Sequence, residues 1–201
     1  MKTLPHFFAF LTFILCLTSF LAQTSGSLDP TFGDDGLVLL LPNDDDNVAT
    51  SLQIQADGSM LIGGYTNSPI FGKNFLLVKL LEDGSLDTSF GDDGMVSTDI
   101  GVGSDDVANA MALDLDGNIY LAGYSDDGSD QNACVVKYTP TGELDMDFGT
   151  DGKVLSDYNE GLTDELKCIE ISLLTGEINV GGSVEITSTQ SRPVIAKYTA
   201  D

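Results

Sequence analysis

Short apolar runs alternate with turn residues along the chain from residue 26 to residue 201. No segment keeps a helical period over three turns, and β-branched and aromatic residues fill the runs, so the pattern predicts an all-β chain. Four runs recur in each of three successive segments. They are Leu37–Leu41, Val48–Ala56, Met60–Tyr65 and Phe75–Leu81 in the first, Met95–Thr98, Val107–Leu115, Ile119–Tyr124 and Ala133–Tyr138 in the second, and Lys153–Ser156, Leu166–Leu173, Ile178–Ser183 and Val194–Tyr198 in the third.

The three segments are copies of one repeat. Gly33, Gly91 and Gly149 each follow a Leu-Asp-x-x-Phe stretch and are spaced by 58 residues. A fixed period of this size is typical of repeat architectures. We assign residues 26–83, 84–141 and 142–201 to repeats 1, 2 and 3.

The second and third runs of each repeat form a predicted hairpin. They are joined by Asp57-Gly58, Asp116-Gly117 and Thr175-Gly176. Asp-Gly between apolar runs predicts a type I′ turn, in which both central residues have positive φ.

The second run of repeat 2 has one bulky and one small face, since Met111 and Leu113 alternate with Ala110 and Ala112. Such a sheet suits stacking against copies of itself, as in propeller blades. The sequence therefore predicts a β-propeller-like array of three four-stranded antiparallel blades.

In such a meander the Asp-Gly turns and the Gly-Asp-Asp-Gly crossovers share one end of the sheets. The other end carries the acidic loops Pro42–Asn47, Asp99–Asp106 and Asn159–Asp164, together with the segments Thr66–Asn74, Ser125–Asn132 and Val184–Arg192. The last three segments differ most between the repeats. Recognition is expected in variable loops on a repeated framework, although drift in unselected loops fits equally well.

Three blades do not close a propeller, which generally has four or more. An open array exposes apolar faces at both ends, and neither end of this chain carries a polar cap. We therefore expect the chain to be part of a larger closed propeller, or to cover these faces by self-association.

The first 22 residues are predicted to be a secretory signal peptide. Lys2 precedes an apolar run, Phe7–Ala22, and Ala22 offers a small residue for cleavage before Gln23. The run has 16 residues, whereas a membrane-spanning helix needs about 20. We expect a secreted or cell-surface protein without a membrane span.

Removal of Lys2 and His6 with this leader leaves seven basic against 32 acidic side chains, a net charge of −25. No histidine remains, which excludes histidine-assisted nucleophiles and imidazole metal sites. Nucleic acid is disfavoured because a polyanion would be repelled. Two cysteines remain, Cys134 and Cys168, and the sequence leaves open whether they pair.

The aspartates allow two interpretations. Residues 33–36 and 91–94 could offer carboxylates to structural Ca²⁺, and Asp114-Leu115-Asp116-Gly117 resembles half of a calcium loop. Asp and Gly are also the residues that tight turns select. No odd polar cluster marks one repeat, so we assign no catalytic or cofactor-binding residue. The chain has no tryptophan, which leaves Tyr65, Tyr124 and Phe71 for sugar stacking.

The repeat motif is long. It reads Gly-x-Leu-Asp-x-x-Phe-Gly-x-Asp-Gly, Asp-Asp-Val-Ala-Asn-Ala-Met-Ala-Leu, Asp-Gly-Asn-Ile-Tyr-Leu-Ala-Gly-Tyr and Val-Val-Lys-Tyr. Over residues 26–201 it resembles the delta-60 repeat family, bacterial extracellular proteins of unknown biochemical function that are expected to form β-propellers. Repeat 3 departs from the motif at Leu174, Thr175 and Ser183. The resemblance implies no catalytic residues.

Together these features predict a secreted acidic β-propeller module with a structural or binding role at the cell exterior, where its ligand would be an extracellular protein or a glycan. The alternative is an extracellular hydrolase, such as a carboxylate-based glycosidase, whose catalytic residues lie in blades beyond residue 201.

Overall fold

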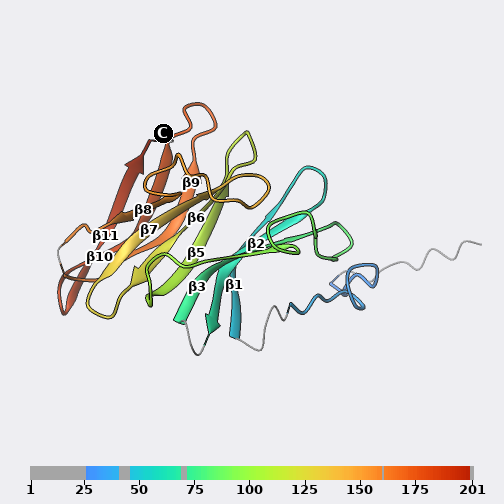
Figure 1. Ribbon diagram of the computed structural model, residues 1–201, viewed down its shortest axis with the longest axis horizontal. Helices are drawn as coiled ribbons and strands as arrows, with labels where there is room; N and C mark the ends of the chain where they lie inside the picture. Colours follow the sequence, from blue (N-terminus) through green and yellow to red (C-terminus); the bar gives the residue numbers. More distant parts are fainter. Residues whose placement is uncertain (1–25, 41–45, 69–71, 160, 200–201) are drawn as a thin grey trace, which may run out of the picture.

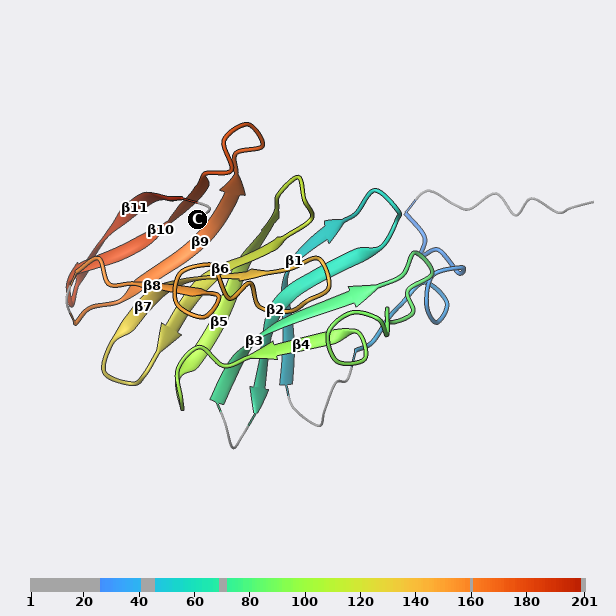
Figure 2. The same ribbon diagram turned by 45° about the horizontal axis from the view of Figure 1, so that its top comes forward.

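The computed structural model describes residues 26–40, 46–68, 72–159 and 161–199. These residues form three antiparallel sheets that stand side by side (Figures 1 and 2). Sheet 1 contains β1 (Asp46–Ile54), β2 (Met60–Ser68), β3 (Gly72–Leu80) and β4 (Met95–Thr98). Sheet 2 contains β5 (Asp105–Leu113), β6 (Ile119–Asp126), β7 (Gln131–Tyr138) and β8 (Lys153–Ser156). Sheet 3 contains β9 (Asp164–Ile171), β10 (Ile178–Thr187) and β11 (Gln190–Tyr198).

The all-β prediction is confirmed, but the strands are grouped differently from our expectation. We expected four strands from one repeat in each sheet, whereas β4 and β8 pair with the last strand of the preceding repeat. The reason is the Gly-Asp-Asp-Gly turn, which folds the chain back so that the Lys79 amide bonds to the Gly94 carbonyl oxygen at 2.9 Å. Sheet 3 consequently has three strands within the described residues.

The run Leu37–Leu41 does not join a sheet within its described part, residues 37–40. Leu37 bridges only to Gly33 and Asp34 of its own turn. Val38 and Leu40 instead pack with Phe32 against a cluster of sheet 1 that consists of Leu76, Val78 and Leu80. This N-terminal segment lies at the end of the molecule away from β9, β10 and β11 (Figures 1 and 2).

Apolar side chains fill the space between neighbouring sheets. Met111 packs toward sheet 1, and Ala112 packs toward sheet 3, as the bulky and small faces predicted. The buried core between sheets 1 and 2 contains Leu61, Phe75, Leu77, Phe90, Ala108, Met111, Ile119, Leu121, Cys134, Val136 and Tyr138. The second core contains Ala112, Tyr120, Ala122, Ala133, Val135, Phe148, Leu166, Ile169, Ile171, Ile178 and Val180.

The hairpin turns differ from the predicted type I′ geometry. Gly58, with φ of 86°, takes the left-handed region, whereas Asp57 does not. The Gly58 amide bonds to the Gln55 carbonyl oxygen, so the loop is wider than two residues and needs only one positive φ. The carboxylate of Asp57 accepts hydrogen bonds from the amide and hydroxyl of Ser59, at 2.9 and 2.6 Å.

The first strand of each sheet contains a β-bulge, at Thr50, Asn109 and Lys167 respectively. The neighbouring strand carries a glycine beside it. At Gly123, a Cβ atom would lie 1.8 Å from the Val107 carbonyl oxygen, so no other residue fits there. In sheets 1 and 2 the side chain of the bulge residue, Thr50 or Asn109, reaches a carbonyl oxygen of the next sheet.

The segments predicted as variable loops are mostly strand. Residues 66–68 belong to β2, and β10 and β11 leave only residues 188 and 189 between them. The paired strands of these hairpins extend beyond the apolar runs from which we predicted them. The predicted signal peptide, residues 1–22, lies outside the described residues, and the described residues contain no helix that could cross a membrane.

Candidate functional site

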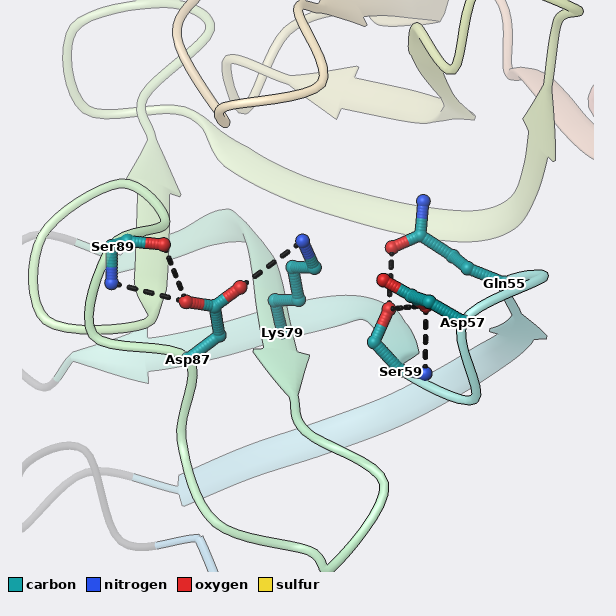
Figure 3. A network of polar contacts seen from close by, with 6 residues as sticks. All are labelled: Gln55, Asp57, Ser59, Lys79, Asp87 and Ser89. Carbon is teal, nitrogen blue, oxygen red and sulfur yellow. Dashed lines mark hydrogen bonds and ion pairs between the residues drawn. The ribbon is translucent and has the colours of Figure 1, made fainter.

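A repeated Lys–Asp network lies at the Asp-Gly end of sheets 1 and 2. In sheet 1, Lys79 Nζ lies 3.1 Å from Asp87 Oδ2, and both side chains are largely buried. Ser89 donates to Asp87 Oδ1 through its hydroxyl at 2.6 Å and its amide at 3.1 Å. These hydrogen bonds and then Lys79 lower the pKa of Asp87 (Figure 3). The network ties the crossover turn to β3.

The same ion pair recurs in sheet 2 between Lys137 Nζ and Asp145 Oδ2, at 2.7 Å. Beside it in sheet 1 lies a separate group in which Ser59 Oγ lies 2.8 Å from Gln55 Oε1 (Figure 3). Because the ion pair repeats, we interpret it as part of the framework. We expect a ligand-binding site to be marked instead by polar or aromatic side chains that are present in one sheet and absent from the others.

Sheet 2 has such a feature at this end. Tyr120 Oη donates to Asp114 Oδ2 at 3.2 Å, and Lys137 Nζ lies 5.6 Å from the centre of the Tyr120 ring. These residues line a pocket of about 270 Å³ together with Asn118, which precedes β6, and Ser172, which follows β9. Sequence reasoning missed this cluster, and the signal that could have found it is a tyrosine where repeat 1 has Leu61.

A second polar group, the Tyr65–Tyr124 surface, lies at the opposite end of the sheets. It consists of Tyr65, Lys73, Asp105, Tyr124 and Glu165, all of them half-buried. Lys73 Nζ lies 3.6 Å from Asp105 Oδ2 and 5.8 Å from the centre of the Tyr65 ring. Burial, and then the charge of Glu165, raise the pKa of Tyr124.

This surface joins all three sheets. Glu165 at the start of β9 accepts a hydrogen bond from Asn109 Nδ2 of β5 at 3.0 Å. Glu165 also pairs with Lys167 at 2.7 Å. The tyrosines that we predicted for sugar stacking are therefore brought together with carboxylates, whereas Ser183 replaces the tyrosine in sheet 3. Phe71, the third predicted residue, lies outside the described residues.

Two fully buried carboxylates, Asp106 and Asp164, hold the loops at this end. Burial raises the pKa of both groups. Asp106 accepts hydrogen bonds from the Ile100 amide at 2.7 Å and from the hydroxyls of Ser104 and Ser125 at 2.7 and 2.6 Å. All these donors belong to the same sheet and its entry loop, so the geometry assigns Asp106 to fixing that loop.

The Gly-Asp-Asp-Gly aspartates have a role in turn geometry. Asp35, Asp93 and Asp151 have φ near 50°, in the left-handed region that aspartate tolerates better than most residues. Within the described ranges, no three side chains of His, Cys, Asp or Glu converge on a common point. The calcium hypothesis remains a prediction.

Neither cysteine forms a disulfide. Cys134 is buried between sheets 1 and 2, where burial raises the pKa of its thiol. Cys168 is exposed on the outer face of sheet 3.

Comparison with known protein families agrees with this architecture. Residues 55–90 and 115–148 match the family described as "Domain of unknown function (DUF5122) beta-propeller". Residues 97–128 match a second family, described as a beta-propeller repeat. The chain contains β-propeller repeats. No curated protein matches the chain.

Proposed function

We propose that the chain is a secreted, acidic β-propeller module that binds an extracellular glycan or protein through the Tyr65–Tyr124 surface. The observation that carries this proposal is the break in repeat symmetry at that surface. The Lys–Asp ion pair, in contrast, repeats between sheets 1 and 2. Here the half-buried Tyr124 of sheet 2 lies near both Tyr65 of sheet 1 and the Glu165 carboxylate of sheet 3.

The chemistry of this surface suits a ligand that carries hydroxyl groups. Asp105 and Glu165 can accept hydrogen bonds from such groups, and Lys73 can donate them. A partly exposed tyrosine ring offers an apolar face and a polar hydroxyl together. The acidic character of the chain disfavours anionic polymers, so we expect a neutral or amine-bearing sugar, or a basic protein surface.

The proposal can be tested by affinity electrophoresis of the purified chain in gels that contain a neutral β-glucan, a mannan, a galactan or chitosan. We expect at least one polymer to retard the chain. The double variant Tyr65→Ala, Tyr124→Ala should lose most of this retardation. Val102→Ala is the matched control, because Val102 is fully exposed at the same end of the sheets but lies outside the Tyr65–Tyr124 surface.

A protein ligand is tested in parallel by chemical cross-linking in culture medium, again with the double variant and Val102→Ala. Any ligand that the wild type and the double variant bind equally well would overturn the assignment of this surface. Absence of binding in both assays would count against the binding role and favour a structural one.

A further inference from the structure

The N-terminal segment, residues 26–40, occupies on sheet 1 the place that residues 84–98 occupy on sheet 2. The Gly33 amide bonds to the Asp83 carbonyl oxygen at 2.8 Å, and the Gly91 amide bonds to the Thr141 carbonyl oxygen at 2.9 Å. In both places a phenylalanine and a valine, Phe32 with Val38 and Phe90 with Val96, surround a glycine of the next turn. Residues 84–98 provide the outer strand of the sheet before sheet 2. By the same arrangement, residues 26–40 would provide the outer strand of a sheet before sheet 1.

The face of β1 on which such a preceding sheet would pack is exposed. On β1, Leu52 is 54% exposed and Ile54 is 67% exposed. Their equivalents on β5 are Met111, which is 5% exposed, and Leu113, which packs against the core between sheets 1 and 2. Leu52 and Ile54 thus belong to a face that is built to receive the inner strands of another sheet.

Sheet 3 lacks an outer strand and a neighbouring sheet on its far face within the described residues. In sheet 1 the outer strand β4 pairs with β3, with Ser97 opposite Leu76 and Val96 opposite Leu77. The equivalents of Leu76 and Leu77 on β11 are Val194 and Ile195, and Ile195 is 88% exposed. Sheet 3 therefore offers three inner strands and a free outer edge within the described residues.

The hydrogen bonds made by the bulge residues also indicate that sheet 3 could pack against a copy of sheet 1. Thr50 Oγ1 of sheet 1 donates to the Ala108 carbonyl oxygen of sheet 2, and Asn109 Nδ2 donates to the Leu166 carbonyl oxygen of sheet 3, both at 2.8 Å. Lys167 is the third bulge residue, and its side chain is 59% exposed. The acceptor that would follow in this series is the carbonyl oxygen of Ala49, on the uncovered side of β1.

We propose that sheet 3 of one copy of this chain packs against sheet 1 of a second copy, and that residues 37–40 of the second copy pair with β11 as its fourth strand. The contact is head-to-tail and continues the interface already present between the sheets. Two copies of three sheets give a ring of six, within the usual range of four to eight blades.

Two residues shape this interface. Pro193, opposite Leu40 in the proposed pairing, has no amide hydrogen, so the added strand would pair mainly along residues 195–197. Gln53 Nε2 lies 3.5 Å from the Met111 carbonyl oxygen across the first interface, whereas its equivalent in sheet 3 is Glu170, which cannot donate when ionised. Glu170→Gln should therefore tighten the association.

The first test is light scattering coupled to size exclusion over a concentration series. We expect a dimer, and Ile54→Glu should raise its dissociation constant by about 100-fold or more, because it buries an unpaired charge. Val102→Glu is the control, since it adds the same charge at an exposed site away from both faces. A monomer at every concentration would overturn the proposal. Assemblies larger than a dimer would overturn the two-copy ring.

The second test places one cysteine on each face in a Cys168→Ser background. Leu39→Cys and Val194→Cys are made in separate chains, because these positions would lie directly opposite each other, as Ser97 and Leu76 do in sheet 1. On oxidation, a mixture of the two variants should yield a cross-linked heterodimer, which neither chain can supply within itself. A mixture that remains uncross-linked would overturn the proposed strand pairing, as would occupation of this face by a different partner.

Discussion

The Thr50 hydroxyl donates a hydrogen bond to the Ala108 carbonyl oxygen at 2.8 Å, across the boundary between sheets 1 and 2. A β-bulge aims Thr50 at this acceptor, and an equivalent bulge in sheet 2 aims the Asn109 side-chain amide at the Leu166 carbonyl oxygen of sheet 3. The first strands of the three sheets are thus joined by a polar contact at the same position, in addition to the apolar cores. This contact fixes the register of one sheet against the next.

Thr50→Val should lower the free energy of unfolding by about 1–2 kcal/mol, because it removes the donor while it keeps the shape of the side chain. Urea denaturation measures the loss. Thr189→Val is the matched control, since the Thr189 hydroxyl lies 3.4 Å from the Thr187 hydroxyl in an exposed turn, and we expect a change within about 0.5 kcal/mol. Equal losses in both variants would contradict the role of Thr50 in joining the sheets.

Asp145→Asn should remove a stabilising contribution that depends on pH. Its hydrogen bond with Lys137 lowers the pKa of Asp145 from the ordinary value of 3.8. Because the folded pKa is depressed, the stabilisation is complete above that ordinary value and is lost as the pH falls through the lowered one. Denaturation at pH 7 should show the variant less stable than the wild type, and the difference should shrink toward pH 3. A constant difference would contradict the ion pair as its source.

Asp106 should show the opposite dependence. Burial raises the pKa of Asp106 in the folded protein above 3.8, so the folded state holds its proton more tightly than the unfolded state. Its contribution to stability therefore falls as the pH rises from about 3.8 through the raised value. Relative to Asp106→Asn, which does not titrate, the wild type should lose stability over this range in chemical denaturation. A gain over the same range would show that the hydrogen bonds from Ser104 and Ser125 outweigh burial.

The strands were predictable because apolar runs and turn residues are local signals. Met95–Thr98 and Lys153–Ser156 form strands with the predicted bounds. Their partners were not predictable, since an outer strand can pair with either neighbouring repeat and only the fold of the Gly-Asp-Asp-Gly turn decides. The turn type at Asp57 also depends on a hydrogen bond, from Gly58 to Gln55, that a dipeptide pattern does not reveal.

The candidate site was only partly predictable. Tyr65 and Tyr124 stood out as aromatic residues in equivalent positions. The proximity of Tyr124 to Tyr65 and to Glu165, which enters from the third sheet, depends on the stacking of the sheets. The Asp114–Tyr120 pair was missed for a different reason. The two residues are six positions apart in the sequence, and the hairpin brings their side chains to 3.2 Å.

Asp93 distinguishes turn geometry from calcium binding. Its φ of 50° suits Asp, Asn or Gly but not a β-branched residue, so Asp93→Val should cost about 1–2 kcal/mol in urea denaturation. Asp93→Asn keeps the turn and removes the charge, and it should leave stability nearly unchanged. The same change to valine at Asp92, which lacks the positive φ, is the control and should cost much less. If calcium raised the melting temperature of the wild type and Asp93→Asn abolished that shift, the carboxylate would be a calcium ligand, and the explanation from turn geometry would be insufficient.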